Sequence, residues 1–329
     1  MLSTLVHRSI FGGVVENTRQ FPDGPGFGFS RNTRTLVDRV DFGVETLLLL
    51  VKHNPIGFFE TLGQLREGVE QIGGLLHELV DKPIKGSLLF QRNPQKEIPR
   101  MTNLLFDAKF ENNPVLIVAP VCPDYEPRTY QLNDGVGETA EKVLSTYPYI
   151  RDLFYKYDFQ TKLRIDVADV EAFDETILQV SRETTPIFLD KVGRTKSAIT
   201  ARAGHSSDIE VGTIYEVFQR HSFDYRKAVT RNAFEILEAK SGSRASVRDQ
   251  LIIERQKNGD LREVGGSQVP SLISMELGGY AAYGEFIGGQ AVILSPDAAS
   301  AIPAYHFGVF KTQEFSPIIY LKNPPEDSI

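Results

Sequence analysis

One nine-residue run constrains this chain more than any other feature of its sequence. Residues 113–121 read Asn-Pro-Val-Leu-Ile-Val-Ala-Pro-Val, a continuous apolar segment rich in β-branched side chains. Such a run is typical of a strand buried on both faces of a parallel sheet, because crossover helices cover both sides of that sheet. We therefore predict a core strand here and an α/β fold around it.

The residues that follow complete a βαβ unit. A polar loop leads to Gly135 and Gly137, a helix is predicted from there to about residue 157, and residues 162–168 form the next predicted strand. Parallel neighbours need a crossover of about this length. We therefore expect a Rossmann-like, mostly parallel sheet flanked by helices.

The chain is predicted to have three parts. Residues 1–30 are rich in glycine and proline, which predicts a loop or a mobile arm. Apolar residues recur at helical spacing over about 33–54 and 58–81, so residues 31–110 are predicted to form an N-terminal helical layer. Residues 111–329 are predicted to form the Rossmann-like α/β catalytic region.

Further elements are predicted in the rest of the chain. The patterns predict helices over 170–182, over 209–240 with a break near 222–224, over 247–256 and over 271–286, and strands over 290–294 and 317–321.

Composition limits the class of protein. A chain of 329 residues can bury a sizeable core, and its net charge of −7, with both signs interspersed, disfavours nucleic acid or an anionic membrane as a partner. The longest apolar run, 47–51, is too short to cross a bilayer, and residues 1–13 lack the apolar stretch of a signal peptide. The single cysteine, Cys122, fits a reducing compartment. We predict a cytoplasmic protein that binds a small-molecule substrate, and a homo-oligomer is left open.

Residues directly after the two predicted strands are the first candidates for a site, because open α/β sheets bind ligands beyond the carboxyl ends of their strands. Asp124 and Tyr125 follow the first strand, and Asp169 ends the second. Desolvating a lone carboxylate is costly, so Asp169 is expected to bind an amine, a hydroxyl group or a cation. The alternative is that it caps the helix that follows. Asp166 is interpreted as a charge on a solvated face or at the start of a helix.

The glycines before the predicted helix are a second candidate. Backbone N–H groups at Gly135 and Gly137 could approach a phosphate or a carboxylate at the start of the helix. The spacing does not match a dinucleotide or P-loop fingerprint, and Glu138 would repel a phosphate. The alternative is a plain turn in which Glu138 and Glu141 favour the helix dipole.

The remaining candidates lie further along the chain. Arg194 and Lys196 are predicted to form a small basic loop suited to a phosphate, with a solvated turn as the alternative. Ser295 and His306 follow the strand at 290–294, and His306 could act as an acid or a base or lie at the surface. The histidines and the cysteine show no ligand spacing, so no metal and no cofactor are predicted.

The order of these motifs resembles the isonitrile (isocyanide) synthase family, which is related to dityrosine biosynthesis. The matching segments are 120–124, Gly137 with Glu138, Asp169, 294–296 and 303–306. The family's Pro-Trp-His reads Pro-Ala-Tyr-His here. The resemblance implies a Rossmann-like enzyme that converts an amino-acid amine to an isocyanide with a pentose phosphate.

The leading hypothesis is a biosynthetic enzyme acting on an amino acid or a sugar phosphate. In it Asp124 and Asp169 hold amine or hydroxyl groups, and Glu138 or His306 handles protons. Substrate binding is assigned to a further set: Tyr125, Gly135, Gly137, Arg194, Lys196 and Ser295. The alternatives are a non-catalytic ligand-binding or regulatory protein on the same fold, and a nucleotide-dependent acyl- or adenylyl-transfer enzyme.

Overall fold

The structure is a computed structural model of the chain. It describes residues 55–81, 87–89, 94–121, 123–124, 131–133, 135–169, 172, 178, 181–204, 206–220, 224–258, 265–287, 290–296 and 316–321. The predicted arm at 1–30, the predicted helix at 33–54 and three predicted residues, Cys122, Tyr125 and His306, lie outside these ranges.

The described strands form one six-stranded sheet with the order β1-β6-β5-β2-β3-β4. Their bounds are β1 (Ser87–Leu89), β2 (Val115–Val121), β3 (Thr161–Val167), β4 (Ile209–Thr213), β5 (Val292–Ser295) and β6 (Ile318–Leu321). All neighbours are parallel except the edge strand β1, which pairs with β6 antiparallel. Counted from β2, the parallel strands have the order 3-2-1-4-5 of a Rossmann-like fold, so the predicted fold class is confirmed.

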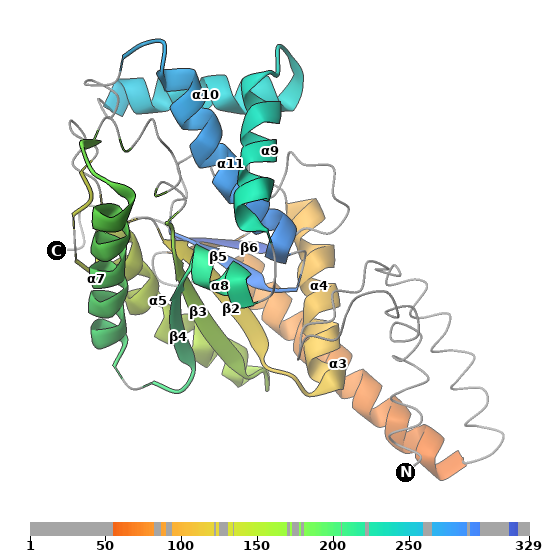
Figure 1. Ribbon diagram of the computed structural model, residues 1–329. Coiled ribbons are helices and arrows are strands. Elements are labelled where there is room, and N and C mark those ends of the chain that lie inside the picture. Colours follow the sequence, from red (N-terminus) through yellow and green to blue (C-terminus); the bar gives the residue numbers. More distant parts are fainter. Residues whose placement is uncertain are drawn as a thin grey trace.

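Helices cover both faces of this sheet (Figure 1). Their bounds are α3 (Pro55–Asp81), α4 (Pro94–Glu111), α5 (Glu138–Lys156), α7 (Thr185–Ala203), α8 (Ile214–Arg220), α9 (Tyr225–Leu237), α10 (Gly242–Asn258) and α11 (Val269–Ile287). Alternate residues of each strand face opposite sides. Ile117 and Ile165 pack in the core with α3, α4, α5 and α7, whereas Val118 and Ile293 pack with α8 and α11.

The N-terminal helical layer is present as α3 and α4. Helix α3 agrees with the helix predicted over 58–81, and its buried residues Ile72, Leu75 and Leu79 repeat at helical spacing. The sequence did not single out α4, which begins at Pro94, a residue tolerated in the first turn of a helix.

The helical prediction over 209–240, with its break near 222–224, is wrong in its first five residues. Residues Ile209–Thr213 form β4, which pairs in parallel with β3 from Leu163 to Val167. Helices α8 and α9 follow, separated near the predicted break. A five-residue segment is too short for its periodicity to separate a strand from a helix, and the neighbouring strand decides the outcome.

The prediction of a basic loop at Arg194 and Lys196 is also wrong, because both residues lie within α7. Gly193 would cost a helix about 1 kcal/mol relative to alanine. Burial of the stripe at Phe188, Val192 and Ile199 against the sheet offsets that cost.

Asp166 is not a solvated charge, contrary to the prediction. Its exposed fraction is 0%, and it lies on β3 on the face that α8 and α11 cover. Arg164, two residues earlier on the same face, donates from Nε to both Asp166 oxygens at 3.0 and 2.9 Å. A buried carboxylate is tolerated here because the arginine compensates its charge.

Helices α9, α10 and α11 lie together at one end of the sheet (Figure 1), and α11 also packs on the face of the sheet that holds Val118 and Ile293. Helices α9 and α11 approach closely at Gly278, where a Cβ atom would lie 2.8 Å from the Ala233 nitrogen and from the Val229 oxygen. Only glycine allows this separation of the two backbones.

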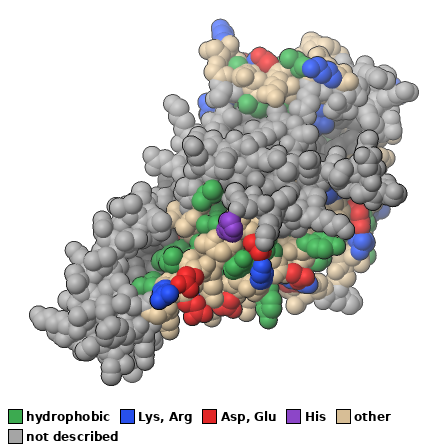
Figure 2. Space-filling model, turned by 180° about the vertical axis from the view of Figure 1, so that it is seen from behind, with side chains coloured by type: hydrophobic (Ala, Val, Ile, Leu, Met, Phe, Trp, Pro, Cys, Tyr) green, Lys and Arg blue, Asp and Glu red, His purple; other side chains and the backbone are tan. Residues whose placement is uncertain are grey.

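The face opposite to the view of Figure 1 carries charges of both signs, which lie side by side among hydrophobic side chains in Figure 2. Ion pairs also join separate helices, such as Lys156 of α5 with Glu78 of α3. Among the described helices, none is long and apolar enough to cross a membrane.

Candidate functional site

The order of the strands changes direction between β2 and β5, and ligands of such sheets bind at this switch point. Strand β5 ends at Ser295, which is buried, and Pro296 follows it. Lys142 of α5 donates a hydrogen bond of 2.8 Å from Nζ to the Pro296 carbonyl. This contact ties the first helix of the βαβ unit to the strand end on the other side of β2.

Asp124 lies beside the start of α5. Its backbone oxygen accepts a hydrogen bond of 2.8 Å from the Asn133 N–H, which holds Asp124 and Asn133 together. Gly137 is the N-cap of α5 and has a φ of 76°, and a Cβ atom on it would lie 3.3 Å from Asp124 Oδ1. The Asp124 carboxylate therefore contacts the glycine turn directly.

The charges around this turn disfavour a phosphate. Glu138 and Glu141 lie in the first turn of α5, and the Asp124 carboxylate occupies the close approach to Gly137. Glu141 is paired with Arg202 of α7 at 2.6 Å. Of the two interpretations of Gly135 and Gly137, the geometry favours the turn, and the acidic groups favour a ligand that carries a positive charge or hydroxyl donors.

Asp169 lies on the next strand end, immediately beyond β3. The Ala168 N–H donates to the Val121 carbonyl at 2.8 Å, so the carboxyl ends of β2 and β3 lie side by side. The Asp169 side chain is almost fully buried, with 2% of its surface exposed. Its Oδ1 accepts a hydrogen bond of 3.1 Å from the Tyr215 backbone N–H.

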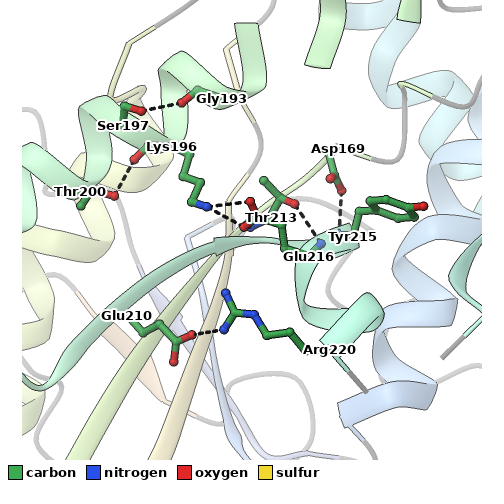
Figure 3. A network of polar contacts seen from close by, with 10 residues as sticks. All are labelled: Asp169, Gly193, Lys196, Ser197, Thr200, Glu210, Thr213, Tyr215, Glu216 and Arg220. Carbon is green, nitrogen blue, oxygen red and sulfur yellow. Dashed lines mark hydrogen bonds and ion pairs between the residues drawn. The ribbon is translucent and has the colours of Figure 1, made fainter. Parts of the chain in front are cut away.

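Thr213 and Glu216 fix the backbone that faces Asp169. The Thr213 hydroxyl accepts from the Glu216 N–H, and Glu216 Oε2 accepts from the Thr213 N–H, both at 3.1 Å. This reciprocal arrangement is a capping box at the start of α8. Asp169 thus binds the first turn of α8, whereas the sequence suggested a cap on the helix that follows Asp169 in the chain (Figure 3).

Burial raises the pKa of Asp169 to about 7. The Thr213 hydroxyl and the Tyr215 N–H oppose this rise by hydrogen bonding, and the nearby Glu216 carboxylate adds to it. A carboxyl group that titrates near neutral pH can both accept and release a proton under ordinary conditions.

The two predicted phosphate ligands are already engaged. Lys196 donates to both carboxylate oxygens of Glu216 at 2.7 Å, and Arg194 pairs with Asp190 one turn earlier on α7. Lys196 therefore reaches the Asp169 region through Glu216, whereas Arg194 lies in an exposed i,i+4 pair.

The structure brings most of the described candidates to the ends of the strands, in two groups. Asp124, Gly137 and Glu138 meet at the start of α5, and Asp169 joins Lys196 through α8. Prediction from the sequence missed Lys142, Thr213 and Glu216. The Thr-x-x-Glu spacing of a capping box was present as a signal for the last two.

Within the described ranges, no group of three or more His, Cys, Asp or Glu side chains could hold a metal ion.

No family model matches the chain, and no curated protein matches it. Among solved structures, it is similar to a tryptophanyl-tRNA synthetase homolog from Entamoeba histolytica, with a TM-score of 0.39 and 14% sequence identity. The match covers 77% of this chain and 58% of that chain, so this chain spans less than two thirds of that structure's length. The resemblance to isonitrile synthases stays a prediction from the sequence.

Proposed function

We propose that this protein is a small-molecule enzyme whose substrate carries an amine, most simply an amino acid, at the strand ends around Asp124 and Asp169. The observation that carries the proposal is the buried Asp169 carboxyl at the carboxyl edge of a Rossmann-like sheet, where burial raises its pKa to about 7. Strongly perturbed carboxyl groups in such positions cluster at functional sites.

The negative charge around the Gly137 turn favours one class of substrate over the other. Asp124 and Glu138 present carboxylates at the glycine turn, where a phosphate would need free N–H groups. An ammonium group would instead gain charge-assisted hydrogen bonds from them. Of the two substrate classes that the sequence suggested, an amino acid fits this region better than a sugar phosphate.

Asp169 is the proposed proton acceptor. A base with a pKa near the working pH combines a large ionised fraction with a useful affinity for the proton. An ammonium group must lose a proton before its nitrogen can form a new bond, so a base next to the amine serves any reaction at that nitrogen. The isonitrile-synthase resemblance implies such a reaction, and a phosphate-bearing co-substrate would then bind away from the Gly137 turn.

Thermal-shift and calorimetric titrations of the full chain test the proposal. A ligand at one hundred times its dissociation constant adds about 2.7 kcal/mol of stability. We expect stabilisation by one or more amino acids, and affinity at least about tenfold weaker in Asp169→Asn, which corresponds to about 1.4 kcal/mol.

Asp190→Asn is the matched control, because Asp190 is an exposed carboxylate on α7 that pairs with Arg194. This variant should bind as the wild type does. Stabilisation by nucleotides or pentose phosphates alone, or equal affinity in Asp169→Asn, would contradict the proposal.

A further inference from the structure

A continuous set of polar contacts runs from α7 to Asp169 (Figure 3). Lys196 of α7 binds Glu216 at 2.7 Å, and Glu216 and Thr213 cap each other at 3.1 Å. Tyr215, between these two, donates its backbone N–H to Asp169 Oδ1 at 3.1 Å. Each contact fixes the donor or acceptor of the next one.

We propose that Thr213, Glu216 and Lys196 are positioning residues for Asp169, which hold its carboxyl group in one orientation and balance the charge around it. The inference deepens the proposed function, on which the catalytic role of Asp169 rests. The contacts themselves do not depend on that role.

The capping box is the part of the network that orients the Asp169 carboxyl group. Helix α8 has seven residues, and a helix this short has little stability of its own. Its first turn keeps the Tyr215 N–H directed at Asp169 because Thr213 and Glu216 bind each other's backbone N–H groups. Without the box, this turn could fray and Asp169 would lose its donor.

Lys196 is the residue that compensates the negative charge of Glu216 near Asp169. Among the described residues around Asp169, Glu216 from α8 supplies a negative charge that raises the pKa of Asp169, and Thr213 from β4 and Tyr215 from α8 supply hydrogen bonds that lower it. Lys196 from α7 neutralises Glu216 and lowers the pKa of Glu216 itself. The Lys196–Glu216 pair is partly exposed, so it contributes little to the free energy of unfolding. We expect Lys196 to affect the pKa of Asp169 by compensating the charge of Glu216, which raises that pKa.

The test is a carbon-13 NMR titration of the Asp169 carboxyl in the ligand-free full chain, with the resonance assigned by its loss in Asp169→Asn. Lys196→Met should raise the pKa of Asp169 by about 0.5, because Glu216 is left uncompensated. Glu216→Gln should lower the pKa, because glutamine keeps the capping acceptor and removes the charge.

Variants of Thr213 distinguish an effect on the orientation of Asp169 from a general loss of stability. Thr213→Val should raise the pKa of Asp169, and Thr213→Ser should restore the wild-type value because it keeps the hydroxyl group. If Thr213→Val does not fold, Lys196→Met and Glu216→Gln decide the question, since they alter partly exposed side chains.

Asp190→Asn is the control variant. Asp190 pairs with Arg194 on the exposed side of α7, so this variant breaks an ion pair on the helix that carries Lys196 without altering a contact of Glu216, Thr213 or Asp169. It should leave the titration unchanged. Wild-type pKa values of Asp169 in both Lys196→Met and Glu216→Gln would overturn the inference. Shifted values in a protein that binds no amino acid would instead reject the proposed function and keep the positioning network.

Discussion

The Tyr283 hydroxyl of α11 donates a hydrogen bond of 2.6 Å to Asp166 Oδ2 on β3. Both side chains are fully buried, and Arg164 binds the same carboxylate at 2.9 Å from Nη2. The interaction therefore links α11, which packs with α9, to the central sheet. A buried charge depends on each of its partners, because water cannot replace any of them.

Tyr283→Phe should destabilise the protein by about 1–3 kcal/mol, because it removes a donor from a buried carboxylate without removing the ring. Urea denaturation at constant pH measures the difference. Tyr155→Phe on α5 is the control, since Tyr155 is 74% exposed and should change stability by less than about 0.5 kcal/mol. Equal effects of the two variants would mean that the hydroxyl contact contributes nothing.

Gly278→Ala should loosen the contact between α9 and α11. The added Cβ would lie 2.8 Å from backbone atoms of Val229 and Ala233, which cannot rotate away, so we expect a loss of about 1–3 kcal/mol. Gly73→Ala in α3 is the matched control. No atom lies within 4 Å of its added Cβ, and alanine should stabilise the helix by up to about 1 kcal/mol. Denaturant unfolding of both variants checks the pair, and a neutral Gly278→Ala would contradict the close approach.

Asp169 should make stability fall as the pH rises. Its folded pKa of about 7 lies above the unfolded value of about 3.9, so the folded state binds more protons between these two values. The contribution is full below about pH 4, declines up to about pH 7 and is constant above. Asp169→Asn lacks this titration. The stability of the wild type relative to the variant should therefore drop by about 2–4 kcal/mol between pH 4.5 and pH 7.5. Urea unfolding at both pH values measures it, and a constant difference would show that Asp169 does not titrate in this range.

Gly137→Ala should affect both stability and binding. Its φ of 76° and ψ of 153° lie in a region that only glycine adopts readily, so alanine should cost about 1–3 kcal/mol. Gly204→Ala is the control, with a φ of 71°, a ψ of −156° and open space around the added Cβ. Both variants should lower the unfolding free energy, but Gly137→Ala alone should weaken amino-acid binding, because its Cβ contacts the Asp124 carboxylate. Equal affinities measured by calorimetry would place the ligand away from this turn.

The sequence predicted those elements whose local pattern is unambiguous. The buried run at 113–121 predicted β2, and the apolar periodicity predicted α3, α10 and α11. Helix α7 was not predicted, because Gly193 and the charged residues around it resemble a loop. The buried residues that stabilise this helix form a stripe only once the helix packs on the sheet. The strand β4 was concealed for a related reason, since its hydrogen bonds come from β3.

The residues of the candidate site likewise fall into those that the sequence located and those that only the tertiary structure located. The positions of Asp124 and Asp169 at the ends of strands follow from the order of elements along the chain, and the sequence alone determined them. The strand order placed β5 beside β2, and packing against the sheet put the start of α8 over Asp169. Only the tertiary structure decided that Asp166 is buried and paired with Arg164, and that Lys196 is paired with Glu216. A local pattern fixes backbone conformation over a few residues, whereas burial and charge partners depend on segments that are distant in the chain.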